Sequence, residues 1–172
     1  MRAQARKEGI GLSTAGWRQD FENRLEQADW PVRLRVLLAR RQFQPALGLV
    51  ETKLAELGEA TPALRQTVKI AWTQAMLHKA LVLACLEQWD DSLAVYAQVR
   101  EMGVDPGRRF AAREAMWVLA ATKRWQEFLK EVDAQDLKLV EGDVLTSFVK
   151  QARREVDKVS RQVGTQTQPS PP

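Results

Sequence analysis

Apolar side chains recur at steps of three and four residues along most of the chain, which is the spacing of one face of an α-helix. Runs that alternate apolar and polar residues, as half-buried strands do, are nearly absent. Most glycines and prolines stand between the periodic segments. The pattern therefore predicts an all-α protein. Its helices are expected at residues 16–28, 31–41, 44–57, 62–87, 90–102, 108–122, 126–134 and 143–163.

One short pattern occurs three times, each time between two predicted helices. It is QFQPAL at 42–47, QWDDSL at 88–93 and RWQEFL at 124–129. Each copy has a polar or basic residue, an aromatic, two mostly polar residues, a small or apolar residue and a leucine. Another packing residue, namely Val50, Tyr96 or Val132, follows each leucine by three positions. An aromatic that plugs a tight turn, followed at once by an apolar stripe, is typical of a helical hairpin.

These positions resemble the tetratricopeptide and pentatricopeptide repeat superfamily. In the tetratricopeptide pattern, an aromatic stands three residues before a small residue and a second aromatic four after it, as Trp89, Ser92 and Tyr96 do here. The pattern also has a small residue twelve before Ser92, which is Ala80, where two helices come into close contact. An early tryptophan of the pattern matches Trp30.

The end of the central unit, VREMGVDP, is similar to the end of a pentatricopeptide unit, with Pro106 three residues after Gly103. The resemblance covers about residues 30–134 and departs at Phe128 and Lys53, where the pattern has small residues. It implies a short tetratricopeptide-like solenoid of about three helical hairpins, in which each unit buries its stripe against its neighbours. The alternative is an ordinary helical bundle in which the motifs are coincidental.

We expect one domain between two short segments. Residues 1–15 form a flexible N-terminus, residues 16–163 the helical-repeat domain with its C-terminal helix, and residues 164–172 a disordered tail. No apolar run approaches the roughly 20 residues that span a bilayer, so no membrane span is expected. The basic N-terminus lacks the apolar core of a secretory signal peptide. It resembles a mitochondrial presequence only in its basic residues, and an unstructured start is the preferred interpretation.

The candidate chemical groups argue against an enzyme. Cys85 and His78 stand seven residues apart on one predicted helix, roughly 10 Å along its axis, which is too far for a nucleophile pair. These two residues also cannot complete a zinc site. Asp90 and Asp91 diverge by about 100° on a helix and are interpreted as first-turn acids. We expect no catalytic residue, no metal and no cofactor.

The single cysteine also bears on the compartment. Cys85 lies inside the apolar run ALVLACL and is expected to be buried. Because one cysteine cannot form an internal disulfide, a reducing intracellular compartment is expected. The cytoplasm is preferred, and the nucleus and the mitochondrion are left open.

The resemblance implies that a partner binds on the surface lined by the first helix of each hairpin. The candidate protein-binding residues there are Arg33, Arg40, Lys69, Lys79, Arg108, Arg109 and Arg113. The expected function is a non-enzymatic scaffold or adaptor subunit of a multi-protein complex.

The alternative function is an RNA-associated helical-repeat protein, in which Arg108, Arg109 and Arg113 contact phosphates. The net charge of +4 is compatible with this but too small to select it. A simpler interpretation of the same stretch is a solvated basic start to a helix, with Phe110 in the core. A continuous basic groove would favour RNA, and a mixed or apolar groove would favour a peptide or helix.

The C-terminal region offers two further features. Val149, Ala152, Val156, Val159 and Val163 form a heptad seam. We expect the first half of this helix to cap the array, and the second half either to cap it as well or to pair with a partner. In the tail, Thr165, Gln166 and Thr167 resemble the short motif that the dynein light chain hub protein binds as an added β-strand.

Overall fold

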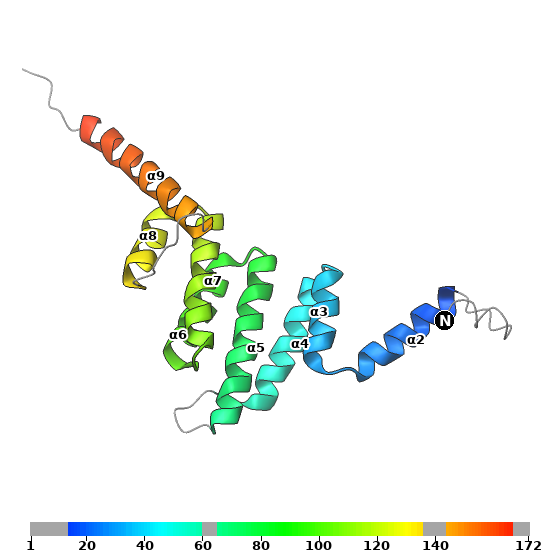
Figure 1. Ribbon diagram of the computed structural model, residues 1–172. Helices are drawn as coiled ribbons and strands as arrows, with labels where there is room; N and C mark the ends of the chain where they lie inside the picture. The colour runs from blue at the N-terminus through cyan, green and yellow to red at the C-terminus, as the bar shows by residue number, and fades with distance from the viewer. Residues whose placement is uncertain (1–13, 60–64, 136–143, 167–172) are drawn as a thin grey trace, which may run out of the picture. The chain divides into compact units, whose positions relative to one another are not determined.

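The computed structural model describes residues 14–59, 65–135 and 144–166, and within these ranges the secondary structure is entirely helical (Figure 1). The helices are α2 (Thr14–Gln27), α3 (Trp30–Ala39), α4 (Phe43–Leu57), α5 (Gln66–Cys85), α6 (Trp89–Met102), α7 (Gly107–Ala121), α8 (Trp125–Ala134) and α9 (Val144–Gln166). The all-α prediction is confirmed for these residues. Helix α5 begins four residues after its expected start at residue 62, and α9 continues three residues beyond its expected end at residue 163.

The chain divides into two compact units, Met1–Leu49 and Val50–Pro172. In the first unit, the guanidinium of Arg40, just after α3, donates two hydrogen bonds to the carboxylate of Glu22 on α2, at 2.7 and 3.1 Å. The same guanidinium lies 5.5 Å from the ring centroid of Phe21. This contact joins the end of α3 to α2 by charge and by a cation–π interaction.

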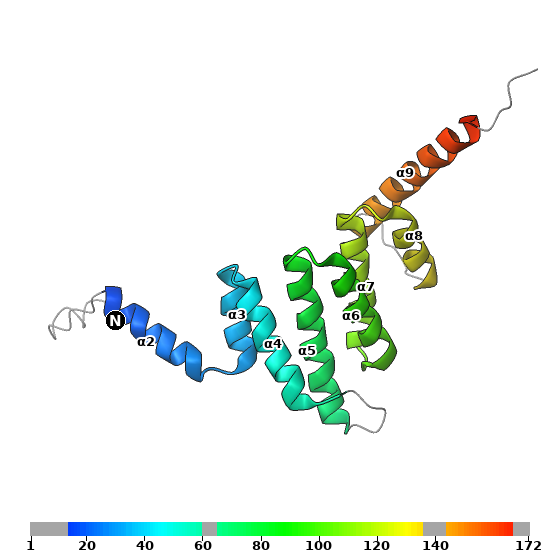
Figure 2. The same ribbon diagram turned by 180° about the vertical axis from the view of Figure 1, so that it is seen from behind.

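In the second unit, neighbouring helices pack in sequence order, so that α5 lies beside α6 and α6 beside α7 (Figures 1 and 2). The closest approach of α5 and α6 is at Ser92, whose Oγ donates a 2.8 Å hydrogen bond to the carbonyl of Ala80. Both residues are fully buried. The predicted close contact between these two small residues is therefore confirmed. A larger side chain at either position would separate the two helices.

The three predicted turns have one and the same backbone structure. Each contains a residue in the left-handed region, namely Arg41 (φ 56°), Glu87 (φ 61°) or Lys123 (φ 58°). The next residue's N–H donates to a carbonyl five residues earlier, from Gln42 to Leu37, Gln88 to Leu83 and Arg124 to Leu119, each at 2.9 Å. This is the hydrogen bonding of a Schellman motif, which satisfies the last carbonyls of the first helix.

An aromatic follows each left-handed residue by two positions and begins the next helix, which is α4, α6 or α8. Phe43, Trp89 and Trp125 are each half-buried. The fully buried position comes three residues later, at Ala46, Ser92 and Phe128. This position faces inward because three residues nearly complete one helical turn.

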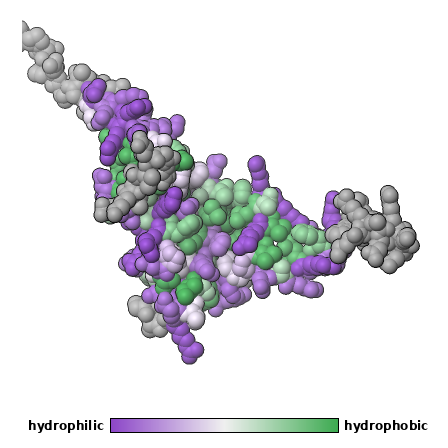
Figure 3. Space-filling model, in the orientation of Figure 1, coloured by the Kyte–Doolittle hydropathy of each residue, from purple (hydrophilic) through white to green (hydrophobic). Residues whose placement is uncertain are grey.

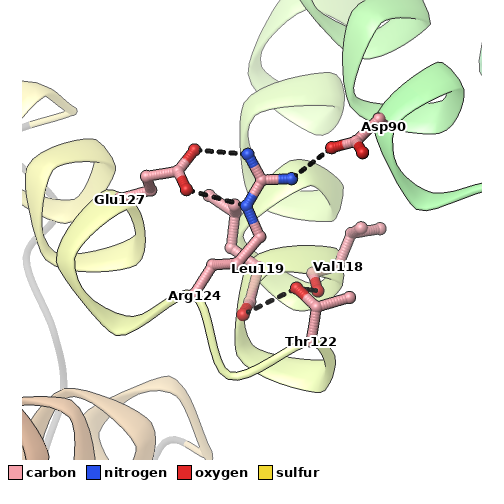
Figure 4. A network of polar contacts seen from close by, with 6 residues as sticks. All are labelled: Asp90, Val118, Leu119, Thr122, Arg124 and Glu127. Atoms are coloured by element: carbon pink, nitrogen blue, oxygen red, sulfur yellow. Dashed lines mark hydrogen bonds and ion pairs between the residues drawn. The ribbon is translucent and has the colours of Figure 1, made fainter.

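The turn between α7 and α8 is also linked to the start of α6 (Figure 4). Arg124 Nε and Nη2 donate to the two carboxylate oxygens of Glu127, at 2.7 and 2.6 Å. Its Nη1 donates to Oδ1 of Asp90 in the first turn of α6, at 2.5 Å. The Glu127 hydrogen bond, followed by that of Asp90, raises the pKa of the arginine, and the arginine lowers the pKa of Glu127. One guanidinium therefore joins the starts of α6 and α8.

The last helix packs on α7 and α8 with its first half only. Leu145, Val149 and Ala152 are buried in a core cluster. Their partners in that cluster are Met116, Leu119 and Ala120 of α7 and Phe128 and Val132 of α8. Phe148 adds an edge-to-face contact with Trp117, with ring centroids 5.5 Å apart. From residue 153 to residue 161 no described side chain is buried, and Figure 3 shows the outer part of α9 covered by hydrophilic residues.

Candidate functional site

An apolar hollow lies between α5 and α7 and has a volume of about 450 Å³. Its lining consists of Ile70, Thr73, Gln74, Leu77, residues 104–107 and Phe110. We call it the α5–α7 groove. Two large apolar side chains on its walls remain open to solvent, since Ile70 is 41% and Phe110 52% exposed. Exposed apolar side chains that gather around a hollow are typical of a binding surface.

One wall of the groove comes from the outer face of α5. Ile70, Gln74, Leu77 and Leu81 follow each other at steps of four, three and four, which places them on one stripe. Leu81 is 39% exposed. The opposite face of the same helix is buried in the core and consists of Trp72, Ala75, Met76, Ala80 and Leu83. α5 is thus apolar on both faces, whereas a surface helix with no partner usually has one polar face.

The floor of the groove is built by glycine. The Thr73 hydroxyl donates to the carbonyl of Lys69, at 2.7 Å, and accepts a hydrogen bond from the N–H of Val104, at 3.3 Å. A Cβ atom at Gly107 would collide with the Thr73 Cγ2 methyl. A Cβ at Gly103 would collide with the carbonyl of Val99. Only glycine allows the turn before α7 to lie this close to α5.

A second hollow, of about 640 Å³, lies beside the first and contains charges of both signs. Arg100, Arg108, Arg109, Glu101 and Asp105 line it, together with Ala97, Ala112 and Gln135. Arg108 Nε donates to the carbonyl of Arg100, at 2.7 Å. Arg100 Nη1 and Glu131 Oε2 form an ion pair at 2.8 Å. The two groups are not oriented for a hydrogen bond. The hollow is therefore mixed in charge and does not form a continuous basic surface.

The seven predicted protein-binding residues are distributed over both units. Arg33 and Arg40 belong to the first unit, where Arg33 is half-buried and Arg40 is held by Glu22. Lys69 and Lys79 are half-buried on α5, and Lys79 Nζ lies 3.2 Å from Glu51 Oε1. Arg108, Arg109 and Arg113 are exposed on α7.

The structure brings Arg108 and Arg109 into one hollow, with Arg113 one turn further along α7. The groove residues Ile70 and Leu77 were not among the predicted site residues, and the prediction that Phe110 lies in the core is wrong. The sequence signal that could have revealed Ile70 and Leu77 is the second apolar stripe of α5.

Cys85 is exposed at the end of α5, so the prediction that it is buried is wrong. The apolar run around it covers more than a full helical turn, and its side chains therefore cannot all face inward. Partial burial raises the pKa of its thiol. His78 Nδ1 lies 2.7 Å from the carbonyl of Gln74 and makes this contact within its own helix.

Burial also raises the pKa of the Tyr96 hydroxyl, and more weakly the carboxylate of Glu114 and the thiol of Cys85 act in the same direction. Desolvation likewise raises the pKa of Glu114, while the nearby Arg113 lowers it. In the described part of the chain, no group of three His, Cys, Asp or Glu side chains is placed to hold a metal ion. None of its helices is long and apolar enough to cross a membrane.

The predicted tail motif falls at the end of the last described range. Thr165 and Gln166 are the penultimate and last residues of α9 and have helical backbone, whereas strand addition requires an extended one. Thr167 lies outside the described residues, as do the rest of the tail and residues 1–13 of the N-terminal segment.

Comparison of the chain with protein-family models, with curated proteins and with solved structures finds no match. What the sequence and the described residues establish is an all-helical protein whose neighbouring helices pack in sequence order.

Proposed function

We propose that this protein is a non-enzymatic scaffold or adaptor subunit that binds another protein of its complex in the α5–α7 groove. The observation that carries the proposal is the pair of exposed apolar side chains, Ile70 and Phe110, on the walls of that groove. Large apolar anchors that enter such hollows contribute most of the energy of protein–protein interfaces. The hydrogen-bonded floor at Thr73 supports a preformed site, which lowers the entropic cost of binding.

We further propose that the three turns mark tetratricopeptide-like hairpins, formed by α3 with α4, α5 with α6 and α7 with α8. The repeated left-handed residue, the repeated five-residue hydrogen bond and the repeated buried position support this assignment. The groove then lies between the first helices of two successive hairpins, where repeat arrays present their binding surface.

The charge distribution favours a protein partner over RNA. Two of the candidate cations already have carboxylate partners, since Arg40 pairs with Glu22 and Lys79 with Glu51. Arg100, which lines the second hollow, pairs with Glu131. Two carboxylates, those of Glu101 and Asp105, lie among the arginines of the second hollow. RNA affinity depends on unpaired cations that replace the counterions of phosphates. We therefore expect only weak RNA binding that disappears as salt rises.

The test is capture of partners from cells that produce the protein, with and without nuclease, read by mass spectrometry. The bait is the tagged full-length chain as wild type, as an Ile70→Ser/Phe110→Ser variant, or as a Val144→Ser variant. Val144 is a matched control because it is 55% exposed, lies on α9 and is not part of the heptad seam. We expect a protein partner that survives nuclease, is absent with the groove variant and is kept by the control. Retention of that partner by the groove variant would refute the proposal.

A second measurement addresses the RNA alternative directly. Single-stranded RNA is titrated into the wild type and into a variant with Arg108, Arg109 and Arg113 replaced by Gln, at low and at physiological salt. For each arginine that binds a phosphate in the wild type, its replacement should lower the slope of log affinity against log salt by about 0.7. Submicromolar binding at physiological salt that those three substitutions abolish would establish the RNA alternative instead.

A further inference from the structure

The apolar stripe of α5 has the length of a helix-binding surface. Ile70, Gln74 and Leu77 line the groove, and Leu81 continues the same stripe beyond it. From Ile70 to Leu81 the stripe spans eleven residue steps, or about 17 Å at 1.5 Å per residue. This length matches about three turns of a second helix. Its apolar members also follow the three-and-four spacing at which one helix packs its ridges into the grooves of another.

The two walls differ in charge. The exposed positions of α5 along the stripe are Ile70, Gln74 and Leu81, all of them uncharged. On α7, Phe110 is next to Arg109 in sequence and one turn before Arg113, and both arginines are exposed. Arg109 has no ion-pair partner within the ranges that the structure describes.

Two carboxylates lie near these arginines. Asp105 lines the groove at its end, before α7 begins. Glu114 is half-buried beside Arg113. Asp105 precedes α7 and Glu114 is half-buried, so the exposed charges of α7 itself are all arginines, while the exposed positions of the α5 stripe are uncharged.

We infer that the occupant of the groove is an amphipathic helix of the partner protein, with large apolar residues on one face and carboxylates along one edge of it. The apolar face packs on Ile70, Leu77 and Phe110, and the carboxylate edge lies against Arg109 and Arg113. This inference rests on the proposed function, because it names the chemistry of the partner at the same site. A helix with a basic edge would instead place like charges together along α7.

The probe is a displayed library of helix-forming peptides, about 15 residues long, selected on the full-length protein. We expect the enriched sequences to have Leu, Met or Phe at steps of three and four, with an excess of Asp and Glu beside them. The enriched peptides are then synthesised and titrated into the wild type and into three variants. These are Phe110→Ala, Arg109→Gln/Arg113→Gln and Arg153→Gln/Arg154→Gln.

The arginine pair on α9 is the matched control, because Arg153 and Arg154 are exposed and their replacement changes the net charge equally. Exposed ion pairs contribute about 0.2–1 kcal/mol each, so removal of the α7 pair should weaken binding about two- to thirtyfold at low salt. Truncation of Phe110 should weaken binding at least about fivefold, as expected for a central apolar anchor. The α9 control should bind as the wild type does.

The outcomes separate the two proposals. Enriched peptides that are neutral or basic but still depend on Phe110 would overturn the acidic edge and leave the groove as the docking site. Equal decreases in affinity in the α7 and α9 arginine variants would also overturn it. Absence of enriched peptides, or binding that Phe110→Ala leaves unchanged, would overturn the proposed function along with the inference.

Discussion

Three residues with side chains, Arg41, Glu87 and Lys123, adopt the left-handed backbone in the turns that follow α3, α5 and α7. This conformation brings Cβ close to the following carbonyl oxygen and costs a residue other than glycine roughly 1–2 kcal/mol. Backbone hydrogen bonds hold each of these residues in place. In the turn after α5, the N–H groups of Glu87 and Gln88 donate to carbonyls of that helix. The three turns therefore contain local strain that glycine would relieve.

Replacing Glu87 by glycine should stabilise the protein by about 0.5–1 kcal/mol, because the relief of strain exceeds the added flexibility of the unfolded chain. The measurement is the midpoint of urea unfolding. Gln88→Gly is the control, since Gln88 has φ −85° and gains no relief, so that variant should be less stable than the wild type. A decrease in the stability of Glu87→Gly would contradict the strain attributed to this turn.

Gly107 is required for a different reason, because the backbone at the start of α7 lies very close to Thr73 of α5. Gly107→Ala should destabilise the protein by about 1–3 kcal/mol, the usual cost of overpacking, because its Cβ would meet the Cγ2 methyl of Thr73. Thr73→Ser removes that methyl and keeps the hydroxyl that bonds Lys69 and Val104. In the Thr73→Ser background the alanine should therefore cost much less.

A double-mutant cycle with thermal unfolding measures this coupling between positions 73 and 107. Equal destabilisation by Gly107→Ala in the two backgrounds would show that the Thr73 methyl does not limit the approach of α7 to α5.

At the scale of elements, α9 consists of two halves with different surroundings. Val149 is buried against α7 and α8, and Val159, ten residues later on the same seam, is 53% exposed. Val149→Ala should destabilise the protein by about 2 kcal/mol, because truncating a buried valine removes apolar burial and leaves a cavity. Val159→Ala should change the stability by less than about 0.5 kcal/mol. Similar effects of the two substitutions on urea unfolding would show that the outer half is packed as well.

The link between α6 and α8 should respond to acid. The Arg124 hydrogen bond lowers the pKa of Glu127 below its ordinary value of 4.5, so the unfolded chain binds more protons near that pH. Its contribution is fully present above about pH 4.5 and disappears as the pH falls through the lower folded pKa. Because these side chains are exposed, the contribution is at most about 1 kcal/mol.

Arg124→Gln should therefore be destabilised less than the wild type when the pH falls from about 7 to about 3. Urea unfolding at the two pH values gives the difference. Arg153→Gln, which changes an exposed arginine on α9, should retain the acid sensitivity of the wild type. Acid sensitivity that is unchanged by Arg124→Gln would show that its carboxylate contacts do not contribute.

The sequence predicted the helices and turns because both depend on local spacing. The three-and-four steps, and the aromatic that begins α4, α6 and α8, lie within a few residues of the structure that they form. The groove was not predictable in this way, because it depends on which face of α5 meets the core. Ile70 and Trp72 are both large hydrophobic residues of α5, yet only Trp72 is buried. The same difference explains Cys85 and Phe110, which are apolar but face outward.

At the scale of the whole molecule, the helices from α5 onward contact their neighbours in sequence, with α5 on α6, α6 on α7, α7 on α8 and α8 on α9. Contacts that are close in sequence cost little loop-closure entropy and favour fast folding. The buried side chains are divided among successive interfaces, and the cluster of α7, α8 and α9 is one of them. An outer helix can therefore detach while the pairs behind it stay packed.

This order of contacts has a consequence for synthesis, which proceeds from the N-terminus. From α6 onward, every helix of the second unit that leaves the ribosome finds its packing partner already made. The residues that line the α5–α7 groove have all been translated once Phe110 is added, and α7 itself is complete at Ala121. The groove can therefore form, and the partner that we propose can begin to bind it, before α9 is complete.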